Sequence, residues 1–167
     1  MIFSVLLLVL VTAQRVSELF ISRHNTDRLM AKGAYEVSPG HYPLIVGLHV
    51  AWLVGLWALA WNRPLNVILA VVFLVLEGLR AWVMTSLGER WTTRIIVLPG
   101  APLVRRGPYR FLPHPNYAVV CAEIVLLPLV FGLWVYALVF TVLNAAVLYV
   151  RIRSENAALA AGATPPP

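Results

Sequence analysis

Five apolar stretches alternate with polar connections along the chain. They cover residues 2–21, 43–61, 65–87, 117–132 and 133–151. A bilayer core of about 30 Å takes roughly 20 helical residues, and all but the fourth stretch approach that length. Pro128 and Gly132 interrupt the end of the fourth stretch. The pattern therefore predicts about five transmembrane helices, the last two forming a helical hairpin that turns at Phe131–Gly132.

The composition is typical of a membrane protein. Hydrophobic residues make up 60% of the chain and charged residues 12%, whereas soluble domains average about 25% charged residues. We therefore expect an all-α integral membrane protein with a single transmembrane domain over residues 1–155. Residues 156–167 end in alanine, glycine and proline, which favours a disordered tail.

Basic residues are unevenly distributed over the connections. Segments 22–42 and 88–116 and the tail together hold ten Lys and Arg, whereas the turn 62–64 holds only Arg63. The positive-inside rule then predicts a multi-pass protein of the cell membrane with its N-terminus outside and its C-terminus in the cytoplasm. The net charge of +6 indicates contact with membrane lipid and no nucleic acid, because the basic residues lie between long apolar runs.

Several ionisable side chains lie inside the apolar stretches, where they are costly and become functional candidates. Arg15 and Glu18 share a helix face, and Glu77 and Arg80 repeat that spacing. Each set is either a local ion pair that ties helices together or a functional group. Glu123 has no partner on its own helix, so it is either a protonated core carboxyl or a group that faces a polar pocket.

Two polar stripes predict a cavity open to the cytoplasm. Asn144, Arg151 and Glu155 recur at helical spacing on the last stretch, and Asn116 and Glu123 share a face of the fourth. Facing each other, these stripes would line a cavity between the two helices. We expect Glu123 and Asn144 to contact a substrate there.

The connection before the fourth stretch carries the strongest sign of a binding site. Residues 98–117 read LPGAPLVRRGPYRFLPHPNY, with five prolines and two glycines, so we expect little regular structure. Pro113 and Pro115 stiffen the backbone around His114 just before a helix begins. Asn116 is expected to cap that helix, whose N-terminus favours an anionic group. A rigid, basic surface loop is the alternative interpretation.

Several familiar signatures are missing from the sequence. No GxGxxG motif follows a predicted strand, the four histidines lack the spacing of metal ligands, and no serine lies in a nucleophile elbow. The sequence therefore supports no Rossmann nucleotide site, no metal site and no serine nucleophile.

These motifs resemble those of the isoprenylcysteine carboxyl methyltransferase family, in its small bacterial branch. The matching elements are LGERWTTRI (87–95), LVRRGPYRFLPHPNY (103–117), Glu123 and RIRSEN (151–156). Three upstream segments resemble the bacterial branch more narrowly: RVSELFISRHN (15–25), GAYE (33–36) and HYPLIVGLH (41–49). The resemblance spans nearly the whole chain.

The resemblance implies an integral membrane enzyme that uses S-adenosylmethionine in a cytoplasmic pocket. Tyr109, His114, Tyr117 and Glu155 match positions of that cofactor pocket, and we expect their neighbour Asn116 to bind the cofactor with them. A lipophilic substrate is expected to enter from the bilayer.

Arg151 matches the arginine that the family usually places near the reacting groups. We therefore expect Arg151 to stabilise the acceptor oxyanion, and Glu155 to orient Arg151 or to hold the cofactor. Two positions depart from the family pattern and concern substrate handling. Pro113 stands where members often have arginine, and Asn156 stands where a second carboxylate is usual.

The bacterial branch is associated with O-methylation of long-chain alkylpyrones and alkylresorcinols, and it often accompanies type III polyketide synthases. The resemblance therefore favours O-methylation of such an acceptor or of an isoprenylcysteine-like carboxylate. Two alternatives remain open. One is an NADPH-dependent membrane reductase, which shares the GPYR…HPxY loop in outline, and the other is a non-enzymatic membrane transporter or scaffold.

Overall fold

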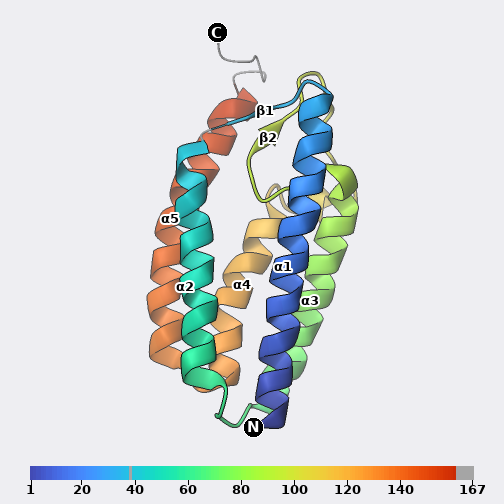
Figure 1. Ribbon diagram of the computed structural model, residues 1–167. Coiled ribbons are helices and arrows are strands. Elements are labelled where there is room, and N and C mark those ends of the chain that lie inside the picture. The colour runs from blue at the N-terminus through green and yellow to red at the C-terminus, as the bar shows by residue number, and fades with distance from the viewer. Residues whose placement is uncertain (38, 161–167) are drawn as a thin grey trace.

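The computed structural model describes residues 1–37 and 39–160, which form an elongated bundle of five α-helices (Figure 1). The helices are α1 (Ile2–Ala31), α2 (Tyr42–Ala60), α3 (Val67–Leu87), α4 (Pro115–Val130) and α5 (Trp134–Ala160). Four of them are long and apolar enough to cross a membrane, and α4 is a shorter apolar helix. The predicted all-α membrane fold is confirmed.

The last two helices form the predicted hairpin. After α4 ends at Val130, the chain turns through Gly132, whose φ of 71° is a left-handed conformation that glycine adopts without strain. The turn between α2 and α3 is joined to this one, because the backbone N–H of Asn66 donates to the Val130 carbonyl at 2.8 Å. Both turns therefore lie at the same end of the bundle as the N-terminus (Figure 1).

Two helices extend beyond their predicted bounds. The first continues to Ala31, ten residues past its apolar stretch, because no glycine interrupts it before Gly33. The last continues to Ala160, into the segment expected to be a disordered tail, through alanine and leucine, which are strong helix formers. The rest of that expected tail, residues 161–167, lies outside the described residues.

The long connections meet at the opposite end of the bundle, which we call the loop end (Figure 1). Strand β1 (Tyr35–Glu36) pairs antiparallel with β2 (Ile96–Val97). Short 3-10 helices precede α2, follow α3 and precede α4: η1 (Pro39–His41), η2 (Gly88–Arg90) and η3 (Gly107–Arg110). The connection before α4 is thus more regular than its prolines predict.

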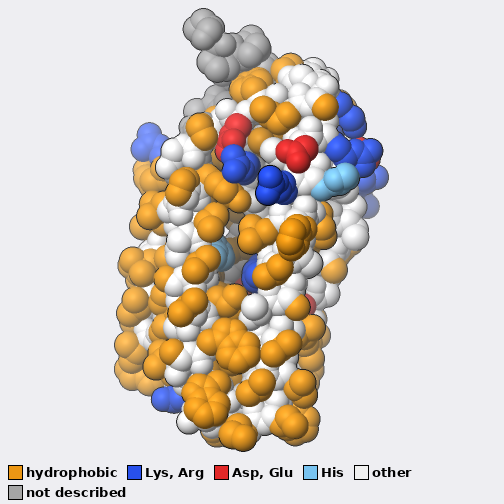
Figure 2. All heavy atoms as spheres, in the orientation of Figure 1, with side chains coloured by type: hydrophobic (Ala, Val, Ile, Leu, Met, Phe, Trp, Pro, Cys, Tyr) orange, Lys and Arg blue, Asp and Glu red, His pale blue; other side chains and the backbone are white. Residues whose placement is uncertain are grey.

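The apolar core fills the half of the bundle away from the loop end. It is built from buried side chains of four helices, including Leu8, Leu56, Phe73 and Leu127. The outside of the bundle is also apolar, and the space-filling view shows charged side chains gathered mainly toward the loop end (Figure 2). Such a surface suits lipid contact, because apolar side chains there need no water.

Helix α2 is tied to the bundle mainly in its second half. The indole of Trp57 donates to the Thr12 hydroxyl of α1 at 2.9 Å, and the Tyr136 hydroxyl of α5 donates to the Trp52 carbonyl at 2.8 Å. Gly55 allows this approach, because a Cβ there would overlap the Tyr136 side chain. Side chains of the first half of α2, residues 42–50, line a cavity.

Candidate functional site

A cavity of about 240 Å³ lies inside the bundle toward the loop end. Its walls come from α1, α2, α3, α4, α5 and the segment 91–93. Figure 2 shows a hollow between α1 and α2, with histidine and Lys or Arg atoms inside it. Most of the wall is apolar, including Val46, Val50 and Leu53 of α2. A wall of this composition suits an apolar ligand.

Four predicted site residues meet where α4 faces α5, and we call them the Tyr117 cluster: His114, Tyr117, Arg151 and Glu155. The Tyr117 hydroxyl donates to the Glu155 carboxylate and accepts from Arg151 Nε at 2.8 Å. His114 stacks on the Tyr117 ring with 5.2 Å between centroids, and its Nδ1 lies 3.8 Å from Glu155 Oε2. Residues 34 and 38 positions apart are thus joined through one hydroxyl group.

The Tyr117 cluster borders the cavity and also reaches solvent. Tyr117 and Arg151 line the cavity, while the side chains of His114 and Glu155 are 22% and 27% exposed. Tyr109, on η3, is half-buried. Burial first, and then the negative charge of Glu155, raises the pKa of the Tyr109 hydroxyl above its ordinary value. Tyr109 therefore stays protonated and can donate a hydrogen bond.

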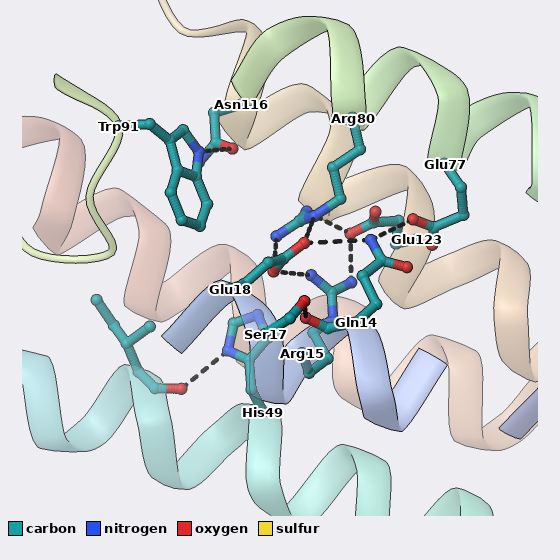
Figure 3. Close-up of polar contacts among 11 residues, drawn as sticks. Gln14, Arg15, Ser17, Glu18, His49, Glu77, Arg80, Trp91, Asn116 and Glu123 are labelled. Carbon is teal, nitrogen blue, oxygen red and sulfur yellow. Dashed lines mark hydrogen bonds and ion pairs between the residues drawn. The ribbon is translucent and has the colours of Figure 1, made fainter. Parts of the chain in front are cut away.

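Asn116 does not cap α4, contrary to expectation. The N-cap is His114, which makes no side-chain capping bond. Because proline fits the first position of a helix, α4 begins at Pro115 and Asn116 falls within the first turn. Asn116 instead lines the cavity and accepts a long hydrogen bond from the Trp91 indole at 3.5 Å (Figure 3).

The segment around Trp91 is held by the end of α1 that extends past its apolar stretch. The Asn25 amide donates to the Trp91 carbonyl at 2.8 Å, and the Ser22 hydroxyl accepts from the Thr93 backbone at 2.8 Å. Tyr42 at the start of α2 bonds the Thr93 hydroxyl at 3.1 Å. These contacts fix the segment 91–93, which forms part of the cavity wall.

The loop before η3 is fixed against α3. Arg106 Nε donates to the Ser86 carbonyl at 2.8 Å. Gly107 follows with a φ of 57°, and a Cβ at that position would overlap the Ser86 hydroxyl. The loop that carries Tyr109 and His114 is therefore packed on the bundle at a point that only glycine fits.

A second group of ionisable side chains, which we call the charge cluster, joins three helices inside the bundle (Figure 3). Its members are Arg15 and Glu18 of α1, Arg80 of α3 and Glu123 of α4. Arg80 binds both oxygens of Glu18, with Nη2 at 2.6 Å from Oε2, and its Nη1 lies 2.8 Å from Glu123. Arg15 also bonds both carboxylates, at 3.1 Å to Glu18 and 2.6 Å to Glu123.

A local pair between Glu77 and Arg80, one of the two interpretations of their spacing, is absent from the described part of the chain. Arg80 turns to Glu18 and Glu123, and the Glu77 carboxylate accepts a hydrogen bond from Gln14 instead. The Arg15–Glu18 pair does form within α1. The charge cluster is therefore an interhelical network, since each arginine reaches a carboxylate on another helix.

The two predicted substrate contacts lie in different surroundings. Asn144 lines the cavity, and its amide lies 3.5 Å from the Cys121 sulfur. Glu123 is fully buried behind Arg15 and Arg80 and is not part of the cavity wall. Its Oε1 atom has no hydrogen-bond partner among the described residues. The substrate contacts of both residues stay predictions.

The cavity also contains residues that the polar stripes do not predict. Arg15, Glu18 and Arg80 line it from α1 and α3, and His49 lines it from α2 (Figure 3). His49 carries a usable signal, because an ionisable side chain within an apolar span is a functional candidate. Its neighbours in the cavity could not be named from sequence, because spacing does not fix how helices rotate against one another.

Comparisons with known proteins place this geometry in context. Residues 67–161 match the model of the isoprenylcysteine carboxyl methyltransferase (ICMT) family. The chain is 39% identical over 159 residues to the uncharacterized protein YpbQ of Bacillus subtilis, covering 92% of this chain and 95% of that protein. It is 28% identical over 156 residues to an uncharacterized protein of Haemophilus influenzae, covering 89% and 90%.

Proposed function

Because the chain belongs to the isoprenylcysteine carboxyl methyltransferase family, we propose that it transfers a methyl group from S-adenosylmethionine to an oxygen atom of a lipophilic acceptor. The family makes it a membrane methyltransferase, in agreement with its long apolar helices. One observation carries the choice of donor and acceptor. The polar Tyr117 cluster borders an apolar cavity that is hollowed toward the surface between two helices.

The residues of the Tyr117 cluster suit the chemical groups of the donor. Glu155 offers carboxylate oxygens to an ammonium or to ribose hydroxyls, and the rings of His114 and Tyr117 suit an adenine ring or a sulfonium cation. The first turn of α4 has no side-chain cap, which suits a carboxylate. When bound, the donor supplies an electrophilic methyl group on a positively charged sulfur.

The chain's own part in the reaction is to position groups and to stabilise charge. Arg151 lines the cavity and is oriented by the hydroxyl of Tyr117, so its guanidinium can stabilise negative charge on the acceptor oxygen. Glu155 holds that hydroxyl from the other side. Holding the reacting atoms in line can supply roughly 7–11 kcal/mol of the barrier.

The proposed acceptor has a long apolar chain and a polar group at one end. Val46, Val50 and Leu53 offer its chain an apolar wall, while Asn144 adds an amide to the same cavity. Long-chain alkylpyrones and alkylresorcinols have this form, and a type III polyketide synthase is the partner that would make them. We place the loop end in the cytoplasm, because the basic residues gather there.

Ligand-induced stabilisation of the purified protein tests the donor. S-adenosylhomocysteine at about one hundred times its Kd should stabilise the protein by about 2.7 kcal/mol, seen as a higher unfolding temperature, whereas NADPH should have no effect. Glu155→Gln should weaken this response, and Glu89→Gln, at an exposed position, should keep it. Stabilisation by NADPH alone would favour the reductase, and no response to either ligand would favour the non-enzymatic alternative.

Mass spectrometry of lipids tests the acceptor. Lipid extracts from cells with and without the protein should differ by species that gain the mass of one methyl group. The same extracts from cells carrying Arg151→Ala should resemble those without the protein. If the methylated species appeared equally in extracts with and without the protein, the proposed activity would be contradicted.

A further inference from the structure

His49 is an ionisable side chain of the cavity wall that the proposed function does not use. Its Nδ1 lies 2.8 Å from the carbonyl of Ile45 on the same helix. A carbonyl oxygen only accepts hydrogen bonds, so Nδ1 carries the hydrogen and Nε2 of the neutral ring carries the lone pair. Among the described residues Nε2 has no hydrogen-bond partner. The ring therefore offers the cavity a free basic nitrogen.

The position of His49 suits contact with a substrate head group. It lines the same cavity as Tyr117 of α4 and Arg151 of α5. Figure 3 shows its second ring nitrogen turned away from the Ile45 carbonyl, on the side where α1 carries Arg15 and Glu18. A head group bound in this cavity would therefore have a base on α2 and a cation on α5 in the wall around it.

Charged groups of both signs lie near His49. Arg15 and Glu18 line the cavity from α1 and Arg80 lines it from α3, with Glu123 of α4 behind them. Arg15 and Arg80 disfavour a further positive charge on the ring, whereas Glu123 favours it. The neutral imidazole is therefore the form that meets the substrate, and a proton that it takes up has to leave again after the reaction.

We propose that His49 Nε2 is the base that removes the proton of a hydroxyl acceptor, which makes the substrate a long-chain phenol or enol. This inference rests on the proposed methyl transfer. The O–H bond breaks and its proton moves to Nε2. The freed oxygen electron pair bonds the methyl carbon while the carbon–sulfur bond of the donor breaks, leaving its electron pair on sulfur. The imidazolium then releases the proton to water.

The charges in the cavity favour a hydroxyl over a carboxylate as the acceptor. A carboxylate at neutral pH has no proton to lose, so His49 would have no part in its methylation. The arginines that line the cavity from α1 and α3 already bond Glu18 and Glu123, so of the arginines in this wall Arg151 is the one left to face an incoming anion. Bringing another carboxylate into an apolar cavity costs far more than bringing in a hydroxyl.

A coloured probe reads proton transfer without any donor. The probe is a long-chain alkylnitrophenol, which changes colour when it ionises, titrated on the purified protein in detergent. The bound probe should ionise at lower pH on the wild type than on His49→Gln or His49→Phe, while His24→Gln, at an exposed histidine of α1, should match the wild type. His49→Gln keeps a hydrogen-bond acceptor, so its binding of the probe should persist.

Turnover with donor and a long-chain phenol completes the test. His49→Gln should lower kcat by about 10²–10⁴-fold, with little change in KM, and should abolish the fall in rate at low pH. Unchanged probe ionisation and turnover in both variants would overturn the assignment, as would faster methylation of a long-chain carboxylate independent of His49. If the wild type bound no S-adenosylhomocysteine, the proposed function would fail, whereas the probe titration would still decide on His49.

Discussion

The charge cluster and the Tyr117 cluster are both built from arginine and glutamate, yet they are constructed differently. In the charge cluster, the side chains of Glu18, Arg80 and Glu123 are at most 5% exposed, and each arginine bonds two carboxylates. In the Tyr117 cluster, Arg151 reaches its carboxylate only through a tyrosine hydroxyl, and Glu155 is 27% exposed. The first arrangement is closed, and the second has room for a ligand.

This difference separates a structural role from a chemical one. Apolar attraction between helices is weak in lipid, so packing and polar contacts decide how helices associate. The charge cluster joins α1, α3 and α4 in this way, and α2 contributes no side chain to it. The opening between α1 and α2 therefore lies beside the helix that the network leaves out.

Breaking the closed cluster should have the largest effect. Arg80→Met leaves Glu18 and Glu123 with Arg15 alone, and removing one partner of a buried ion pair costs about 3–5 kcal/mol. Chemical unfolding in detergent would measure this loss. Adding Glu18→Gln should recover part of the stability, because it removes a carboxylate left without its bidentate partner. Wild-type stability of Arg80→Met would show that the network does not hold the three helices together.

The open cluster should show the reverse pattern, with activity lost before stability. Arg151→Ala should lower kcat by about 10²–10³-fold, as the loss of one oxyanion-stabilising donor does, while destabilising the fold less than Arg80→Met. Arg151→Lys keeps the charge but loses the Nε bond to Tyr117, so we expect it to recover part of the rate. Radiolabelled methyl transfer and unfolding of the same preparations measure both. Full activity of Arg151→Ala would remove the guanidinium from the chemistry.

The loop that supplies the open cluster can be loosened by a single methyl group. Gly107→Ala combines a left-handed backbone with overlap on Ser86, and such strain costs about 1–3 kcal/mol. We expect weaker binding of S-adenosylhomocysteine, because the loop carries Tyr109 and His114, with helix content unchanged by circular dichroism. Gly100→Ala is the matched control, since its φ of 73° is also left-handed but its Cβ would meet nothing. Equal effects of both would mean that backbone strain alone is responsible.

The same contrast explains what the sequence could predict. Apolar length marked the spans, since each helix must satisfy its own backbone in lipid. The Arg15–Glu18 pair, one of the two interpretations of that spacing, formed because both residues lie on one face of one helix. Ion-pair partners on different helices could not be predicted from the sequence. Arg80 pairs with Glu18 and Glu123 and not with Glu77, because the rotation of α1, α3 and α4 about their axes brings those two carboxylates to it. The Tyr117 cluster was named through family motifs, whereas its contacts through one hydroxyl required the fold.

The smallest effect should come from an arginine–glutamate pair outside the bundle. Arg94 Nη1 lies 2.8 Å from Glu36 Oε2, with side chains 41% and 18% exposed. The Glu36 carboxylate raises the pKa of Arg94 above its ordinary value, so the arginine keeps its charge at any accessible pH. Exposed pairs contribute about 0.2–1 kcal/mol and weaken in salt. Glu36→Gln should therefore lower the unfolding free energy only within that range, and the difference should vanish in 1 M salt. If Glu36→Gln lowered the unfolding free energy as much as Arg80→Met does, burial would not explain why the two kinds of ion pair differ in strength. The stability of the charge cluster would then have a cause other than its burial.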